Sequence, residues 1–159
     1  MNGQTKMRGN LIIIILGTCP EIIKMSPIIQ ECKQQIINYF ILHTGQHYSD
    51  KIDRTSFKEL GLSEATYNLD AGFDTHAEQT RKILADVEKA LMRDNPDVVF
   101  VQDDTNTVPA GVLAAAKLHI RVGHVEAGLW SPDGRIPEEI NRVMTDHIPA
   151  LEIEQIIPI

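Results

Sequence analysis

Cysteine and positive charge are both scarce in this sequence. The only two cysteines, Cys19 and Cys32, lie 13 positions apart and outside any C-x-x-C spacing. This arrangement excludes a redox motif and a zinc ribbon, and it favours a reducing, cytoplasmic compartment. Lys and Arg number 15 against 22 Asp and Glu, for a net charge of −7, which argues against a nucleic-acid-binding surface. A small anionic ligand remains compatible, because helix-start amides and one or two cations suffice to hold a phosphate.

Long hydrophobic runs are also missing. The longest, residues 11–16, is far short of the roughly 20 residues that a membrane-spanning helix needs. One alternative is a leader peptide ending at a lipid-modified Cys19, with Lys6 and Arg8 before the apolar run. We disfavour it because the run is short, Thr18 suits the cleavage position poorly, and cleavage would remove a predicted strand. We therefore expect no membrane association.

The length of 159 residues, with 43% apolar and 23% charged, predicts one globular domain that folds without disulfides or metal. Apolar runs at 11–16, 39–43, 97–102 and 121–125 predict strands, and segments at 27–35, 48–60, 75–95, 106–119 and 137–148 predict helices. Ser26 and Pro27 resemble an N-cap and a first helical residue after a short helical turn at 20–25. Thr75 and Glu78 have the spacing of a capping box. This alternation predicts an α/β fold with a doubly wound parallel sheet.

A polar cluster follows each strand-like run: GTCPE, TGQH, DDTNT and EAGL. In a parallel sheet the carboxyl ends of the strands face one crevice, so Glu21, His47, Asp104 and Glu126 are expected to converge there. Such a group of carboxylates suits acid–base chemistry, because crowding raises the pKa of one carboxyl above that of its neighbour. Function is therefore expected at this edge of the sheet.

Several of these residues also have purely structural interpretations. Asp104 precedes a helix, where aspartate is a common N-cap, and Asp103 is interpreted as incidental. Strand alternation sends His124 and Glu126 to the same face, as metal ligands would need. The further ligands would be scattered, so no metal is predicted, and a buried, hydrogen-bonded His124 is the alternative.

Two cations have similar alternatives. Lys24 lies in the first helical segment, where its amine could reach a phosphate or simply face solvent. Arg142 lies one turn after Glu138 and could bind an anion or pair with that carboxylate. A phosphorylated, hydroxyl-rich ligand is the class that these residues favour.

Six motifs together indicate a family. In order they are GTCPEIIKMSPII, HTGQHY, THAEQT, VQDDTNT, GHVEAGL and PEEINRVMTDHI, and they resemble the non-hydrolysing UDP-N-acetylglucosamine 2-epimerases. Residues 1–10 are polar and are expected to be frayed. The resemblance implies a Rossmann-like domain at 11–148, the amino-terminal half of a glycosyltransferase-B-like architecture. It stops after 148, so 149–159 is expected to be a divergent tail without the next strand, and the second domain to be absent.

The resemblance also implies a reaction. Members of the family interconvert UDP-N-acetylglucosamine and its mannosamine epimer, used for cell-surface polysaccharides, by eliminating UDP and adding it back, with no cofactor. On this basis Asp104, Glu126 and Glu138 match the acid–base carboxylates. Lys24 and Arg142 match residues near the diphosphate of the UDP-sugar. His47 lies in a motif facing the same cleft.

The chain departs from the family pattern at four positions. Cys19 and Trp130 replace arginines, Asp103 replaces the glycine of GDT, and Pro109 lies where an ordinary helix residue is usual. Pro109 is tolerable in a first helical turn and costs about 3 kcal/mol deeper in a helix.

With half of the cleft missing, weak binding and low activity are expected. The alternatives are an inactive nucleotide-sugar-binding module, and an assembly fragment that pairs with itself or with a full-length subunit. A glycosyltransferase-like domain is disfavoured because PEEINR follows the epimerase pattern.

Overall fold

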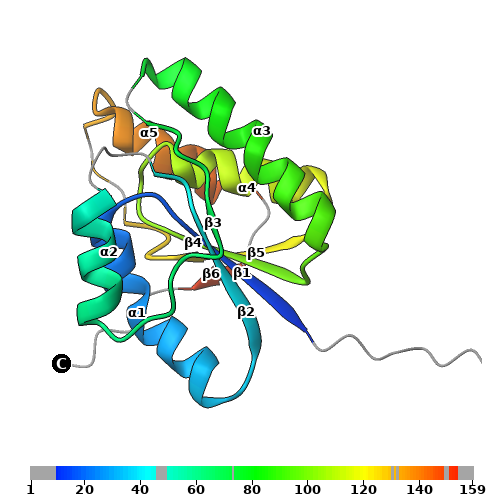
Figure 1. Ribbon diagram of the computed structural model, residues 1–159. Helices are drawn as coiled ribbons and strands as arrows, with labels where there is room; N and C mark the ends of the chain where they lie inside the picture. Colours follow the sequence, from blue (N-terminus) through cyan, green and yellow to red (C-terminus); the bar gives the residue numbers. More distant parts are fainter. Residues whose placement is uncertain are drawn as a thin grey trace, which may run out of the picture.

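The computed structural model describes residues 10–45, 50–72, 74–129, 131, 133–148 and 151–153, and within them a single parallel sheet (Figure 1). Six strands pair in the order β3-β2-β1-β4-β5-β6. Their bounds are β1 Leu11–Leu16, β2 Asn38–His43, β3 Tyr67–Asn68, β4 Val98–Gln102, β5 Arg121–Val125 and β6 Leu151–Ile153. The chain builds outward from β1 in one direction and then returns beside it at β4. The topological switch point, where ligands bind in such sheets, therefore lies between β1 and β4.

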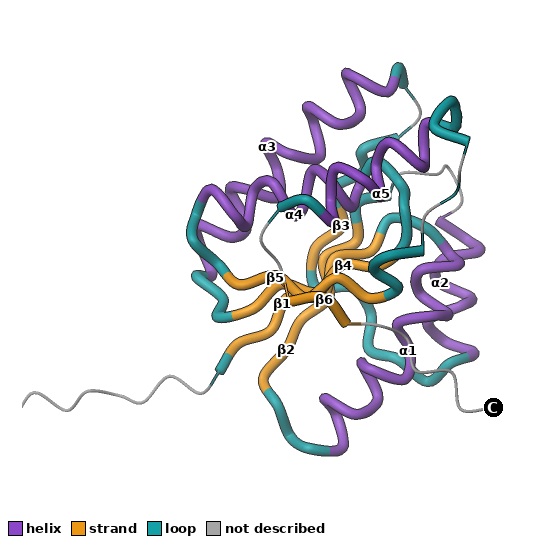
Figure 2. Tube along the Cα trace, turned by 180° about the vertical axis from the view of Figure 1, so that it is seen from behind, coloured by secondary structure: helices purple, strands orange, loops and turns teal. Residues whose placement is uncertain are grey.

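Helices cover both faces of the sheet, as Figures 1 and 2 show from opposite sides. The helices are α1 Cys19–Gln34, α2 Asp50–Glu59, α3 His76–Asp94, α4 Thr107–Lys117 and α5 Pro137–Asp146. Helices α1 and α2 pack on one face, and α3, α4 and α5 lie over the other. The predicted doubly wound α/β fold is confirmed.

The central strand β1 explains this layering. Ile13 and Ile15 point into the core under α3 and α4, whereas Ile14 and Leu16 point into the core under α1. All four are at most 1% exposed. A strand buried on both faces must be apolar throughout, and for this reason LIIIIL shows no polar alternation.

The start of α1 differs from the prediction. The expected break at Ser26 and Pro27 was wrong, because one continuous helix runs through both residues. Pro27 cannot donate the backbone hydrogen bond that the carbonyl of Ile23 would normally accept. The Ser26 hydroxyl donates to that carbonyl at 2.8 Å instead, so the helix continues past the proline.

Helix α3 begins and ends as predicted. The Thr75 hydroxyl accepts the Glu78 amide at 3.3 Å, and Asn95 closes the helix with φ +46°. The second bond of a capping box, from the Thr75 amide to the Glu78 carboxylate, is not formed. Asp74 accepts the Thr75 amide at 2.7 Å, and the Glu78 carboxylate binds Arg81.

Two short strands were missed. Strand β3 has only two residues and pairs with the carboxyl end of β2, too short for any periodic pattern. Strand β6 pairs in parallel with β5. The expectation that the chain after 148 lacks the next strand was therefore wrong, because residues 151–153 extend the sheet. No apolar run marks this strand in the sequence, and it is recognised only by its pairing with β5.

Candidate functional site

A pocket of about 170 Å³ opens at the carboxyl ends of β4 and β5, close to the switch point. Four of its five lining residues are charged: Lys24, Asp103, Glu126 and Arg142, with Leu129 as the apolar member. They come from helix α1, the turn after β4, the segment after β5 and helix α5. Parallel topology thus gathers side chains that are up to 118 positions apart in the sequence.

Lys24 forms the first charged centre of the pocket. Its Nζ donates to Glu126 Oε2 at 2.8 Å and to Asp103 Oδ2 at 3.2 Å. Gln102 Nε2 is a second donor to Glu126 Oε2. Partial burial lowers the pKa of Lys24, but the hydrogen bonds to Glu126 and Asp103 outweigh it, and the pKa is raised overall. Lys24 therefore remains a cation at any physiological pH.

Arg142 forms the second centre. Its Nη1 donates to Glu139 Oε2 at 2.7 Å, and its Nη2 donates to Asp104. Glu139 is only 3% exposed and also accepts the Ser131 amide at 2.8 Å. Asn141 adds a bond from its Nδ2 to the Asp104 carbonyl at 2.8 Å. Helix α5 is thus joined to the turn after β4 by one ion pair, Arg142–Asp104, and by the hydrogen bond from Asn141.

The environment of Asp104 shifts the pKa of its carboxyl upward. Burial and then the negative charge of Asp103 raise the pKa of the Asp104 carboxyl, against the opposing attraction of Arg142. The ion pair also shows that Asp104 does more than cap a helix. A carboxyl whose pKa lies above its usual value suits a general acid.

Glu21 is a fully buried carboxyl beside the pocket. It accepts the Thr105 hydroxyl at 2.7 Å and the Gly17 amide, so it joins the turn after β1 to the turn after β4. Burial raises the pKa of Glu21 to about 7, and the negative charge of Asp103 adds to this rise. The predicted convergence of Glu21 with the other edge residues is confirmed in this sense, although its complete burial was not expected.

The turn after β1 must pass very close to helix α4. A Cβ atom at Gly17 would lie 2.3 Å from Thr107 Oγ1 and 3.1 Å from Thr44 Oγ1. These two hydroxyls share a hydrogen bond of 2.8 Å. Glycine is required at position 17 because no side chain fits there, and this contact sets where α1 begins relative to α4.

The backbone turns sharply where two acidic residues enter the pocket. Asp103 has φ +76° and Glu126 has φ +65°, both in the left-handed region. The interpretation of Asp103 as incidental was wrong as to its position, since its side chain lines the pocket. Its conformation also explains the glycine at this place in the motif that the chain resembles, because glycine adopts positive φ at no steric cost.

The expectation that His124 and Glu126 share a face was wrong. His124 bonds through Nδ1 to Asp146 Oδ1 of α5 at 2.7 Å, whereas Glu126 reaches Lys24 of α1 on the other side of the sheet. Strand alternation ends at Val125, because the positive φ of Glu126 redirects its side chain.

His124 is buried and hydrogen-bonded, as in the alternative interpretation. It is 2% exposed, and its Nε2 lies 3.3 Å from the Asp103 carbonyl. Asp146 Oδ2 also accepts the Gly128 amide at 2.9 Å, which fixes the segment after β5. Within the described part of the chain, no group of three or more His, Cys, Asp or Glu could hold a metal ion.

The predicted site residues do not all meet. Lys24, Glu126 and Arg142 line the pocket, and Asp104 adjoins it through its bond to Arg142. Glu138 is exposed in the first turn of α5 and is not among the described lining residues. The proposed Arg142–Glu138 pair was wrong, because Arg142 pairs with the next residue, Glu139.

Other positions singled out in the sequence have mixed outcomes. His47 and Trp130 lie outside the described residues. Pro109 lies in the first turn of α4, where its missing N–H has no intrahelical acceptor to lose. Cys19 Sγ lies 3.0 Å from Ser56 Oγ, so it contacts α2.

Sequence reasoning missed Glu139 and Gln102. Glu139 could have been found, because it lies three residues before Arg142 on a helix, the spacing of a common ion pair. Gln102 carried no sign beyond its place at the end of a strand.

A parallel sheet with a charged pocket at its switch point defines the class of doubly wound α/β domains that bind ligands at this edge. Known proteins specify the class further. The sequence profile of the UDP-N-acetylglucosamine 2-epimerases matches residues 30–154, beyond the expected end at 148. This is most of the chain, and the chain belongs to the UDP-N-acetylglucosamine 2-epimerase family.

Individual relatives agree with this assignment. A UDP-N-acetylglucosamine 2-epimerase of Methanocaldococcus jannaschii is 58% identical over 137 residues, which is 86% of this chain and 37% of the relative. A UDP-2,3-diacetamido-2,3-dideoxy-D-glucuronate 2-epimerase of Pseudomonas aeruginosa is 40% identical over 138 residues, or 86% of this chain and 39% of the relative. The chain thus spans little more than a third of the length of these curated relatives.

A solved structure shares the fold. The crystal structure of the M. jannaschii UDP-GlcNAc 2-epimerase in complex with UDP-GlcNAc and UDP superposes with a TM-score of 0.84 at 57% identity, covering 87% of this chain and 38% of that one. The Rossmann-like architecture implied by the motifs is confirmed. Within the described residues, no helix is long and apolar enough to cross a membrane.

Proposed function

We propose that this chain provides the acid–base half of a UDP-N-acetylglucosamine 2-epimerase site. The observation that carries the proposal is the pocket at the switch point, where Lys24 and Arg142 are each bound by two carboxylates. Cations and carboxylates in one pocket are what a diphosphate-leaving-group reaction with proton transfer requires.

The substrate proposed is a UDP-sugar. Lys24 and Arg142 would bind the diphosphate, with Lys24 as a point charge and Arg142 as a planar fork. The complex of the M. jannaschii relative with UDP-GlcNAc and UDP supports this ligand class. The Pseudomonas relative is named for a different UDP-sugar, so N-acetylglucosamine rests on the more similar relatives.

The chemistry proposed is elimination followed by re-addition. A carboxylate removes the proton from carbon 2, and the electron pair of that C–H bond forms a double bond to carbon 1. The bond from carbon 1 to the diphosphate oxygen breaks, and UDP leaves with that electron pair. UDP then adds back to carbon 1, while a carboxylic acid returns a proton to the opposite face of carbon 2.

Asp104, Glu126 and Glu138 are the carboxylates proposed for these proton transfers. The raised pKa of Asp104 suits the donor role. Glu126, held as a hydrogen-bond acceptor by Lys24 and Gln102, suits a base. Glu138 would have to reach the substrate from the exposed first turn of α5, and His47 would complete the cleft.

An inactive nucleotide-sugar-binding or assembly module is the second candidate. The pocket volume of about 170 Å³ is below the roughly 300 Å³ at which small-molecule sites begin, so this chain encloses a UDP-sugar only in part. We propose a domain that runs from residue 11 through β6. We further propose low activity for this chain alone, a cytoplasmic location, and pairing with itself or a full-length subunit.

Calorimetric titration of the whole chain with UDP tests the proposal. We expect saturable binding in the high micromolar to millimolar range. A heat signal that does not saturate with UDP, under conditions where the chain is folded, would contradict the proposed function.

Proton exchange separates the two candidates. With UDP-N-acetylglucosamine in D₂O, the epimerase half-site incorporates deuterium at carbon 2, measurable by NMR even when net turnover is slow. Glu126→Gln should abolish this incorporation. Binding of UDP without any deuterium incorporation would favour the inactive module.

A further inference from the structure

Negative charge outnumbers positive charge around the pocket. Two cations, Lys24 and Arg142, are bound by four carboxylates, those of Asp103, Asp104, Glu126 and Glu139. An incoming diphosphate would therefore have to displace carboxylates that already occupy its cations. Which of them opposes the ligand most depends on how firmly each is held.

Two of the four carboxylates have a second donor, and a third belongs to a residue that is also held through its backbone. Glu126 accepts from Gln102 as well as from Lys24, and Glu139 accepts the Ser131 amide as well as Arg142. Asp104 is held by the guanidinium of Arg142, and its backbone carbonyl by Asn141. These groups support the elements that build the pocket.

Asp103 is placed differently. Its backbone has φ +76°, a conformation that favours glycine, and this strained turn directs its carboxylate to Lys24 Nζ at 3.2 Å. Its negative charge raises the pKa of Glu21 and of Asp104, so it also lies close to two other carboxyl groups. The side chain is 20% exposed and borders the pocket directly.

We propose that Asp103 determines the affinity of this site for diphosphates, because its carboxylate competes with the ligand for Lys24. This inference rests on the proposed function, and it assigns to Asp103 a role opposite to that of Lys24. Lys24 attracts the diphosphate, whereas Asp103 neutralises that amine and repels the anion. The residue limits ligand binding without belonging to the proton-transfer machinery.

Replacement of the carboxylate by an amide is the direct test. Asp103→Asn keeps a side chain that tolerates positive φ and removes only the charge. We expect UDP to bind roughly two- to tenfold more tightly to Asp103→Asn than to the wild-type chain, the range of a partly exposed ion pair. The gain should diminish at high salt, because screening weakens the repulsion.

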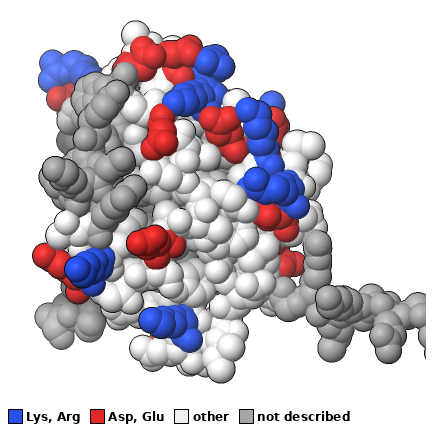
Figure 3. Space-filling model, viewed as in Figure 1, with Lys and Arg blue, Asp and Glu red and all other residues white. Residues whose placement is uncertain are grey.

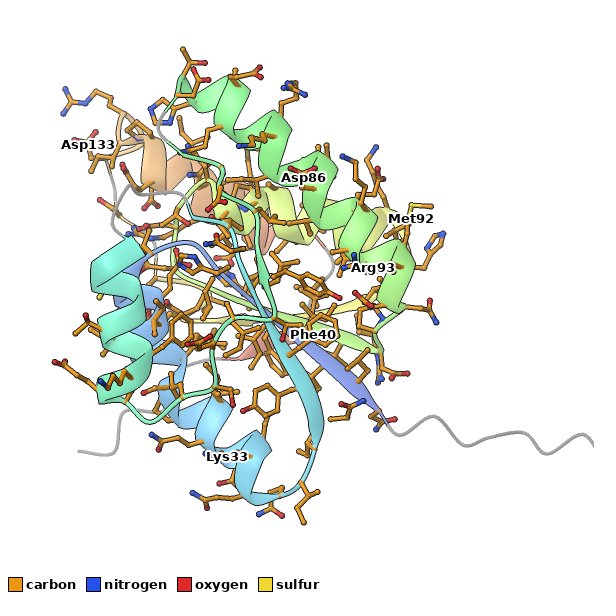
Figure 4. All side chains as sticks on the ribbon, viewed as in Figure 1. Lys33, Phe40, Asp86, Met92, Arg93 and Asp133 are labelled. Atoms are coloured by element: carbon orange, nitrogen blue, oxygen red, sulfur yellow. The ribbon has the colours of Figure 1, made fainter. Side chains whose placement is uncertain are left out.

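Asp86→Asn is the matched control. Asp86 lies on α3 and pairs with Lys89 at 2.8 Å, with 28% of its side chain exposed. Figure 4 shows it on the outer helix, and Figure 3 shows acidic and basic groups interspersed over that helix. The two variants change the net charge equally, so an equal gain in both would make the effect a general one and overturn the assignment to Asp103.

A double-mutant cycle tests the route through Lys24. In the Lys24→Met background, Asp103→Asn should change UDP affinity by less than twofold. A full gain in that background would overturn the competition for Lys24. Equal UDP affinity of wild type and Asp103→Asn would overturn the inference but leave the proposed function intact, whereas no UDP binding by either chain would remove both.

Discussion

The two charged centres of the pocket are alike in composition and unlike in anchoring. Each has one cation and two carboxylates. At the Arg142 centre the arginine is 28% exposed, and its partners Glu139 and Asp104 are 3% and 14% exposed. At the Lys24 centre the lysine is 39% exposed and its partners 20% and 13%.

This difference separates a cation that also joins two elements from a cation that is bound only at the pocket. The Glu139 carboxylate is removed from water and must stay paired, so Arg142 links α5 to the turn after β4 while it also lines the pocket. Pairs near solvent exchange partners at small cost, so the Lys24 centre can release a carboxylate to take a diphosphate. A site that must bind an anion needs both kinds of centre.

Removal of the Arg142 guanidinium gives the largest expected effect. Arg142→Met leaves the Glu139 carboxylate buried without its cation, and we expect a loss of about 2–4 kcal/mol in the free energy of unfolding. Urea denaturation followed by circular dichroism measures it. A loss below about 1 kcal/mol would show that the two centres do not differ.

A pH series on Glu21 tests how much charge this edge of the sheet tolerates. Burial raises the pKa of Glu21 from 4.5 to about 7 in the folded chain. Below pH 4.5 both states are protonated and the group costs nothing. As the pH rises from 4.5 to 7 the unfolded state ionises first, so folding stability falls, and above pH 7 the loss is complete.

The expected loss from this linkage between pH 5 and pH 8 is about 2–3 kcal/mol. Glu21→Gln has no such group, so its stability should fall by that much less than wild type over the same interval. Denaturation at both pH values, with Glu88→Gln on α3 as a surface control, gives the comparison. Parallel pH dependence of wild type and Glu21→Gln would contradict the burial of an ionisable group here.

Replacement of the exposed cation should leave the fold intact. Lys24→Met is expected to change the free energy of unfolding by less than about 1 kcal/mol, while UDP affinity falls about tenfold. The same denaturation and calorimetry used above measure both quantities. If stability falls as far as in Arg142→Met, the Lys24 centre is structural too, and the contrast disappears.

Relief of backbone strain gives the smallest effect. Asp103→Gly removes a non-glycine residue at φ +76° and an ion pair at the same time. The two opposing contributions leave an expected net gain of about 0.5 kcal/mol. A thermal melt of this variant beside Asp103→Asn checks the balance, since only the glycine variant relieves the strain. Equal melting temperatures of the two variants would show that the positive φ of residue 103 does not destabilise the fold.

The sequence predicts the fold well where patterns are long. Strand Arg121–Val125 has the predicted bounds, and α3 has its predicted N-cap at Thr75. Helix α1 was divided wrongly, because sequence does not show that the Ser26 hydroxyl replaces the hydrogen bond that Pro27 lacks. The missed strand β6 depends on pairing with β5, a contact between distant segments.

The site was predictable in location but not in detail. Parallel topology predicts Glu126 at this edge, and the family resemblance adds Lys24 and Arg142, which line the same pocket. The faces of His124 and Glu126 depend on one positive φ at Glu126, which strand alternation does not predict. The choice of Glu139 over Glu138 as partner for Arg142 depends on helix orientation, known only once α5 is packed.

Mapping of UDP binding by NMR tests most directly whether UDP binds in the pocket at the carboxyl ends of the strands. Amide chemical shifts of the whole ¹⁵N-labelled chain would be followed during a UDP titration. We expect shifts in the turns after β1, β4 and β5, around Gly17, Asp103 and Glu126, with little change along α3. Saturable shifts confined to the opposite edge, around Asn95 and His119, would contradict this expectation.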